Sequence, residues 1–184
     1  MPQQGAPEFS EQVVDQTDGY LEAISDCVGL LSRLVDAYDG EESAERLVAE
    51  IREGESDCDA RSRRLSALVT DTTVAEFGIR NSRVHLNAEQ VVRLYQLLDE
   101  IPNAAEKIAD ALATVAPERR RSCFRQYREM VGYATEAMAA VEDAVREFVR
   151  LLTASTETGS IAASVETVRA AESDCDDIRK AVVA

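Results

Sequence analysis

The stretch LNAEQVVRLYQLLDEIPNAAEKIADAL, residues 86–112, decides the fold. Its apolar residues recur at alternating intervals of three and four: Val91, Leu94, Leu98, Ile101, Ala105, Ile108 and Leu112. This spacing predicts a long helix that packs against its neighbours at shallow angles. Asn87 is the expected N-cap, because Gln90 follows three residues later. Leu86 and Val91 occupy the two positions of a hydrophobic staple.

Helical periodicity extends over most of the remaining chain. It predicts further helices from just after Ser10 to about residue 38, over about 43–68 and 117–153, and after Gly159-Ser160. Ser10 is the expected N-cap of the first, and Pro117 the first residue of the fourth. The expected buried positions of the last helix are Ile161, Val165, Val168, Ile178 and Val182. Pro102 predicts a kink in the central helix. With no alternating run that indicates a strand, the fold class is all-α, an antiparallel bundle of long helices.

Composition narrows the possible functions. The chain has 184 residues, of which 45% are hydrophobic, and a net charge of −15 from 35 acidic and 20 basic residues. This surface repels nucleic-acid phosphate, so no nucleic-acid partner is expected. Strong acidity with only two lysines, Lys107 and Lys180, is typical of halophilic proteins. We expect no membrane span and no secretory signal, hence a cytoplasmic location with four reduced cysteines.

One acidic pentapeptide occurs twice. ESDCD stands at residues 55–59 and again, 117 residues later, at 172–176. A looser pair precedes the two copies: GYLEAI begins at Gly19 and GYATEAM at Gly132, which is 113 residues later. Two matches at nearly the same offset indicate an internal duplication of helix pairs.

Helical geometry selects two carboxylates in each copy. Glu55 and Asp59 lie on one face, one turn apart, and Glu172 and Asp176 repeat this arrangement. Carboxylates stacked in this way repel each other unless a cation or a basic side chain lies between them. A solvated charged face is the alternative, since i,i+4 ion pairs are available: Asp57 with Arg61, Asp59 with Arg63, and Asp176 with Lys180.

These residues resemble a known family. ESDCDARSRRL and ESDCDDIRKAV are similar to the E-x-x-x-D motif of PhoU-like regulators of phosphate transport. The similarity is greatest to the branch accessory to Pit-type inorganic phosphate transporters. The stretch AEQVVRLYQLLDEIPNAAEKIAD resembles the aspartate-rich segment of that branch. The resemblance implies one PhoU-like domain over residues 1–184. Repeat one would cover about 9–113, and an incomplete repeat two about 117–184.

The resemblance also implies a metal site and a partner. Acidic motifs of adjacent helices would face one another and hold iron, manganese, zinc or magnesium ions. The implied first site comprises Glu55, Asp59, Asp99, Asn103 and Glu106. Oxygen ligands without histidine favour hard cations. Asn103 stands where the family commonly has aspartate. The sequence ends eight residues after Asp176, where the family would supply a sixth helix with facing acids. The resemblance therefore implies only half a site at Glu172 and Asp176, unless another subunit completes it or the chain is a shortened version.

Two functions remain open at this point. The first is a non-enzymatic regulator that docks on a Pit-type phosphate transporter at the inner membrane face, with a homodimer as one possible state. The second is a purely structural or oligomerising bundle without metal. A ferritin-type metalloenzyme is disfavoured, because the Glu-x-x-His pairs that such an enzyme needs are missing.

Overall fold

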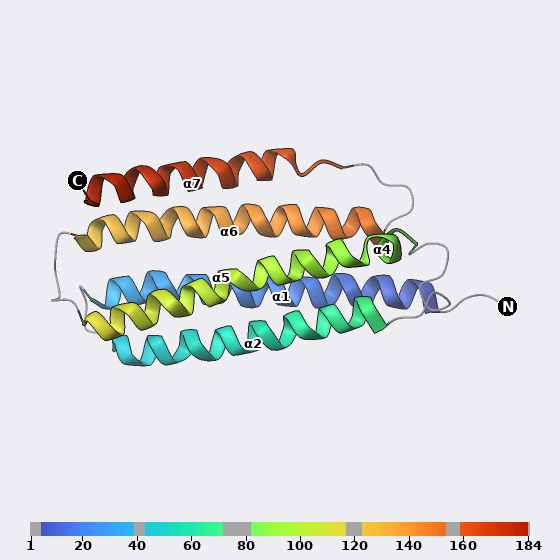
Figure 1. Ribbon diagram of the computed structural model, residues 1–184, viewed down its shortest axis with the longest axis horizontal. Helices are drawn as coiled ribbons and strands as arrows, with labels where there is room; N and C mark the ends of the chain where they lie inside the picture. Colours follow the sequence, from blue (N-terminus) through green and yellow to red (C-terminus); the bar gives the residue numbers. More distant parts are fainter. Residues whose placement is uncertain (1–4, 39–42, 72–81, 117–122, 154–158, 184) are drawn as a thin grey trace.

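The computed structural model describes residues 5–38, 43–71, 82–116, 123–153 and 159–183 (Figure 1). Every regular element within these residues is a helix: α1 (Gly5–Ala37), α2 (Ala44–Asp71), α4 (Ser82–Leu86), α5 (Ala88–Val115), α6 (Cys123–Thr153) and α7 (Ala162–Val183). The predicted all-α class is therefore confirmed. None of the described helices is long and apolar enough to cross a bilayer.

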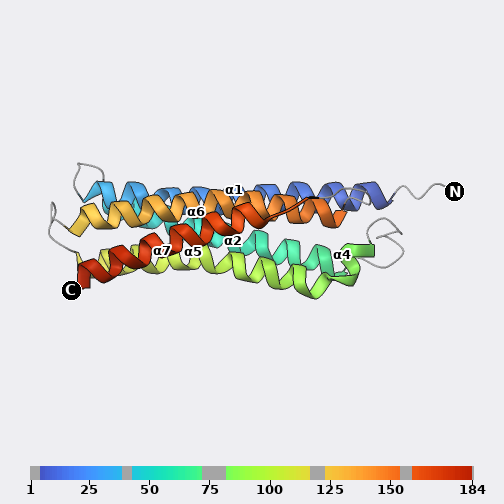
Figure 2. The ribbon, with the colours of Figure 1, turned by 90° about the horizontal axis from the view of Figure 1, so that it is seen from above.

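The five long helices run side by side, and each is antiparallel to the next along the chain (Figures 1 and 2). α1 lies at the centre and contacts α2, α5 and α6. α2 packs along α5, and α7 packs mainly on α6 at the outer edge of the bundle. The first helix pair, α1 and α2, is thus covered by α5, whereas the second pair, α6 and α7, has no equivalent covering helix among the described residues.

The core follows the contacts of α1. Tyr20, Tyr95 and Phe124 are its largest fully buried side chains, and they come from α1, α5 and α6. Ion pairs reinforce the contact between α1 and α6: Arg128 Nε lies 2.6 Å from Asp36 Oδ1, and Arg146 Nε lies 3.0 Å from Asp18 Oδ1. These contacts connect the two helix pairs through their first helices.

Some predicted helix ends differ from the observed ones. α1 begins at Gly5, so Ser10 is not its N-cap. Asn87 precedes α5 but makes no side-chain capping bond; its Nδ2 donates to the Arg83 carbonyl at 2.7 Å. The short helix α4 ends directly before Asn87 and supplies this carbonyl, which explains the difference. Leu86 is 78% exposed, so the predicted staple with Val91 is also absent. Pro117 lies outside the described residues.

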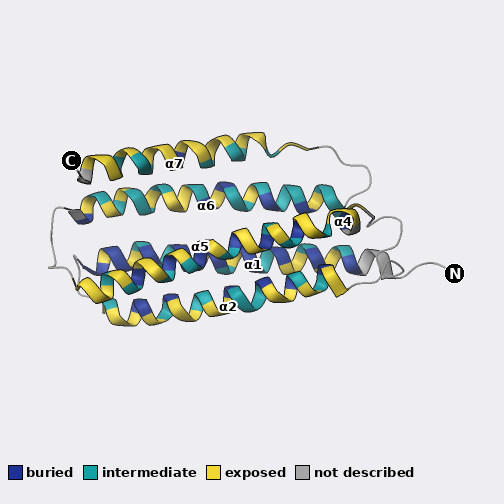
Figure 3. Cartoon of the chain, in the orientation of Figure 1, coloured by how far each residue is buried: buried dark blue, intermediate teal, exposed yellow. Residues whose placement is uncertain are grey.

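Burial differs along the central and last helices from the prediction. Of the α5 series, Val91, Leu98 and Ala105 are buried, but Ile108 is 47% exposed. α7 is mostly exposed or half-buried (Figure 3). Of the expected positions, Ile161, which precedes α7, and Val165, Val168 and Ile178 are only half-buried, whereas Ala171 is buried. The side chain of Val182 is not among the described ones. Both differences have one cause, which is that fewer helices surround these surfaces than the apolar pattern alone suggests. α5 itself continues through Pro102 without a break.

Candidate metal site between α2 and α5

Close packing of α1 and α2 positions the first acidic motif. Gly54 of α2 faces Cys27 of α1: a Cβ placed on Gly54 would lie 3.6 Å from Cys27 Sγ, an ordinary van der Waals distance. Glu55 follows immediately, on the side of α2 that α5 covers. Glu55, Asp59, Asp99, Asn103 and Glu106 are all half-buried there, whereas Asp57 is exposed. The four carboxylates of this set interact across α2 and α5, and Asn103 lies on α5 between Asp99 and Glu106.

Four carboxylates form what we call the acid face: Glu55 and Asp59 on α2, and Asp99 and Glu106 on α5. Desolvation raises the pKa of Glu55, and the charges of Glu106, Asp59 and Asp99 raise that pKa further. Of the three charges, that of Glu106 raises the pKa of Glu55 most, which indicates that Glu55 on α2 and Glu106 on α5 face each other. The acid face therefore disfavours a proton-free Glu55 in the absence of a cation.

Basic side chains neutralise only part of this surface. Arg63 pairs with Asp59, and Arg61 Nε lies 2.6 Å from Asp57 Oδ2, as the sequence predicted. Among the described residues, Glu55 and Glu106 have no basic partner. These two carboxylates consequently carry the unbalanced negative charge of the acid face.

Asp99 is held by Tyr20, a buried tyrosine of α1. Tyr20 Oη donates to Asp99 Oδ1 at 3.2 Å, and this bond partly offsets the desolvation that raises the pKa of Asp99. Burial also raises the pKa of Tyr20 itself, so the phenol remains a donor. Thr17 Oγ1 and Tyr95 Oη, 2.8 Å apart, continue the buried polar contacts. A buried tyrosine needs a hydrogen-bond partner, and that requirement is the signal that could have revealed Tyr20.

Two buried thiols lie behind the acid face. Burial raises the pKa of Cys27 to about 11, with further contributions from the charges of Glu55 and Glu106. Burial raises the pKa of Cys58 to about 12. Both thiols therefore stay protonated at neutral pH and pack as small apolar groups. Because the thiolate is the form that binds metal, these thiols are not metal ligands here. Oxygen atoms remain the available ligands.

The acid face is accessible, but its side chains do not converge. Asp59 and Asp99 line a groove of about 550 Å³ over α2 and α5, which gives solvent a path to them. As the side chains stand, no three His, Cys, Asp or Glu residues of the described ranges are grouped closely enough to hold an ion. The Asn103 amide is turned to its own helix and donates to the Asp99 carbonyl at 2.7 Å. Cation binding would require the mutually repelling carboxylates to rotate toward a common point.

The second acidic motif has a different environment. Glu172 is exposed, and Asp176 pairs with Arg179 at 3.0 Å. The predicted pair of Asp176 with Lys180 is wrong, because Lys180 Nζ lies 3.0 Å from Asp177 Oδ1 instead. Because Glu172 is exposed and Asp176 has a basic partner, the second motif matches the solvated alternative more closely than the first motif does.

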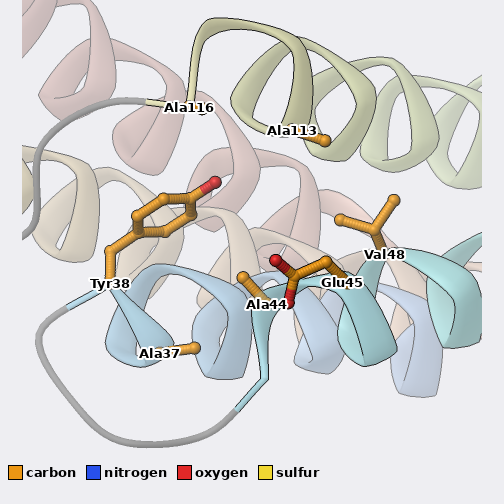
Figure 4. A pocket seen from close by; sticks show the side chains of 7 residues that line it. All are labelled: Ala37, Tyr38, Ala44, Glu45, Val48, Ala113 and Ala116. Carbon is orange, nitrogen blue, oxygen red and sulfur yellow. The ribbon is translucent and has the colours of Figure 1, made fainter.

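A separate pocket of about 270 Å³ lies at the end of the bundle (Figure 4). Its lining is mostly small, with Ala37, Ala44, Ala113 and Ala116 among its residues, and Glu45 is its charged side chain. Small-molecule sites combine an apolar lining with several converging polar groups. This pocket lacks such convergence, and we assign it no ligand.

Comparisons of the chain with family models, with curated proteins and with solved structures find no match. The resemblance to PhoU-like proteins therefore depends on the two acidic motifs and on the segment around Leu98-Asp99-Glu100-Ile101 alone.

Proposed function

We propose that this protein is a non-enzymatic accessory protein of inorganic phosphate transport, in which a divalent cation binds at the acid face. The observation that carries the proposal is the pairing of Glu55 with Glu106 across α2 and α5 without a basic partner, combined with the raised pKa of Glu55 and Asp99. A cation between these carboxylates would replace their repulsion with attraction. PhoU-like proteins, which the motifs resemble, combine such acidic sites with transport regulation.

Cation binding is tested by thermal unfolding with Mn²⁺ or Mg²⁺, followed by circular dichroism. A ligand that binds only the folded state at a concentration of 100 times its Kd stabilises by about 2.7 kcal/mol. We expect a rise in Tm for the wild type that is absent in the double variant Glu55→Gln, Asp59→Asn. The double variant Glu172→Gln, Asp176→Asn removes the same charges from α7 and should respond as the wild type does. Equal responses of both variants would contradict a site at the acid face.

The transport role is tested separately in the source cells. Deletion of the gene should alter phosphate uptake, and a tagged chain should copurify with a Pit-type transporter at the inner membrane face. A deletion strain with normal uptake, together with no transporter in the purified material, would remove this part of the proposal. Cation binding could still stand in that case, since it is measured on the isolated protein.

A structural or oligomerising bundle is the second candidate. It is favoured by the apolar side chains that α5 exposes, Leu97, Ile108 and Val115. Metal analysis distinguishes the two functions: the second candidate predicts no bound metal and no change in Tm with Mn²⁺ or Mg²⁺.

A further inference from the structure

α5 carries a second apolar seam on its outer surface. Six residues recur there at intervals of four, three, four, three and four: Leu97, Ile101, Ala104, Ile108, Ala111 and Val115. Leu97, Ile108 and Val115 are 52%, 47% and 73% exposed, the two alanines are exposed, and Ile101 is half-buried. A different set, which includes Leu98 and Ala105, faces the core, and Ile101 also packs against that core at the edge of the seam. We call the six residues the outer seam.

The outer seam has the spacing by which one helix packs along another. Apolar residues that alternate every three and four positions form the contact line of a coiled coil. Single exposed apolar side chains are common, but a continuous line of them marks an interaction site. Three of the five large hydrophobic residues exposed in the described part of the chain lie on this one seam. The seam therefore requires a partner helix.

Charges beside the outer seam indicate which helix could be its partner. Glu100 and Lys107 are both exposed, and they lie on the same flank of the outer seam, two turns apart. If Ala104 faces Ala104 of a second copy in antiparallel orientation, Glu100 comes within one residue of Lys107 on the other chain. The same register places Leu97 opposite Ala111, so a large side chain meets a small one.

We propose that two copies of this chain associate through the outer seam, with their α5 helices antiparallel about Ala104. The interface is self-complementary, as a twofold dimer requires. Its flank has near-neutral charge although the chain carries −15, and it uses one of only two lysines in the sequence. Glu106 points roughly 180° away from Leu97 on the same helix, but Leu97 and Glu100 also line the groove that gives solvent a path to Asp59 and Asp99, so the dimer would border the acid face.

The first test measures mass by sedimentation velocity on the full chain over a range of micromolar concentrations. Salt is set at about 0.15 M and about 1 M, because screening reduces the repulsion between two acidic copies. The wild type should be a dimer, and Ile108→Glu should weaken it by at least about 100-fold. Ile108 is half-exposed, so this variant should keep the wild-type circular dichroism spectrum and unfold cooperatively.

The second test exchanges the flanking charges. Glu100→Lys and Lys107→Glu should each weaken the dimer about tenfold at low salt, because each breaks two symmetry-related pairs and creates like-charge contacts. The double exchange should restore an affinity close to that of the wild type. Lys180→Glu, on α7, and Glu166→Lys change the net charge equally and should leave the dimer unaffected.

Three results would overturn the proposal. They are a wild type that stays monomeric in both salts, a dimer that survives Ile108→Glu, and a double exchange that fails to recover the affinity lost by the single ones. A wild type that is monomeric alone but binds a helix of another protein would also overturn the proposal of a homodimer.

Discussion

The two copies of ESDCD differ in what surrounds them. On α2, Cys58 has no exposed surface and Glu55 is half-buried beneath α5. On α7, Cys175 is half-buried and Glu172 is exposed, because α6 covers one side of the helix and no described helix covers the other. The same five residues thus acquire different properties from their neighbours. The comparison teaches that an acidic motif can contribute to a binding site only where a second helix packs against it.

The largest expected effect concerns the apolar residues that precede each motif. Ile51 is fully buried, and its counterpart 117 residues later, Val168, is half-buried. Ile51→Ala should lower the free energy of unfolding by about 3 kcal/mol, since it removes buried methylenes and leaves a cavity. Val168→Ala should cost about 1 kcal/mol. Urea denaturation measures both, and equal losses would mean that α7 is covered as completely as α2.

The cysteines allow the comparison to be made with one identical substitution. Cys58→Ser places a hydroxyl in a fully buried position and should cost about 1.5 kcal/mol, because that hydroxyl leaves water. Cys175→Ser, at a half-buried position, should cost less than about 0.5 kcal/mol. Alkylation of the native protein provides an independent check, with Cys175 reacting well before Cys58. A Cys58 that reacts as fast as Cys175 would contradict the tight packing of α2.

How much of this contrast could be predicted depends on which contacts are local. Helices were predictable because intervals of three and four in one segment determine its periodicity. The number of helices that cover α5 was not predictable from this periodicity. Ile108 continues the same series as Leu98 and Ala105, but it lies on the outer surface. The alignment of Glu55 with Glu106 followed from the resemblance.

Contacts between distant segments were the least predictable. The bond between Tyr20 and Asp99 joins residues 79 positions apart, and nothing near either residue in the sequence indicates it. The pairing of Asp176 was also missed, although it is local. Arg179 and Lys180 both lie within reach of the acids one turn before them, and side-chain conformation, which the sequence does not specify, decides between them.

A smaller effect of opposite sign is expected at the residue before each motif. Gly54 on α2 corresponds to Ala171 on α7. Gly54→Ala should raise the free energy of unfolding by about 0.8 kcal/mol, because glycine is unfavourable within a helix. The new methyl group would lie 3.6 Å from Cys27, an ordinary van der Waals distance. Urea denaturation measures the gain, and a loss would show that α1 and α2 cannot accommodate one more carbon here.

The smallest effect concerns pH and the two glutamates. The folded-state pKa of Glu55 is raised above its unfolded value of about 4.3. The folded protein therefore binds more protons than the unfolded chain between these two pKa values, and stability falls as pH rises through this window. Glu55→Gln removes the repulsion and should gain about 0.5 kcal/mol at pH 7 in the presence of a chelator. The gain should disappear below about pH 4, where the carboxyl of the wild type is protonated in both states.

Glu172→Gln separates the acid face from the overall charge of the chain. It removes the same unit of charge from the exposed copy, so it measures how much any neutralisation stabilises a protein with a net charge of −15. Glu172 is exposed, and its substitution should change stability little at either pH. If both variants gain equally at pH 7, self-repulsion of the whole surface explains the effect. If only Glu55→Gln gains, the repulsion belongs to the contact between α2 and α5, which is the property that a cation site requires.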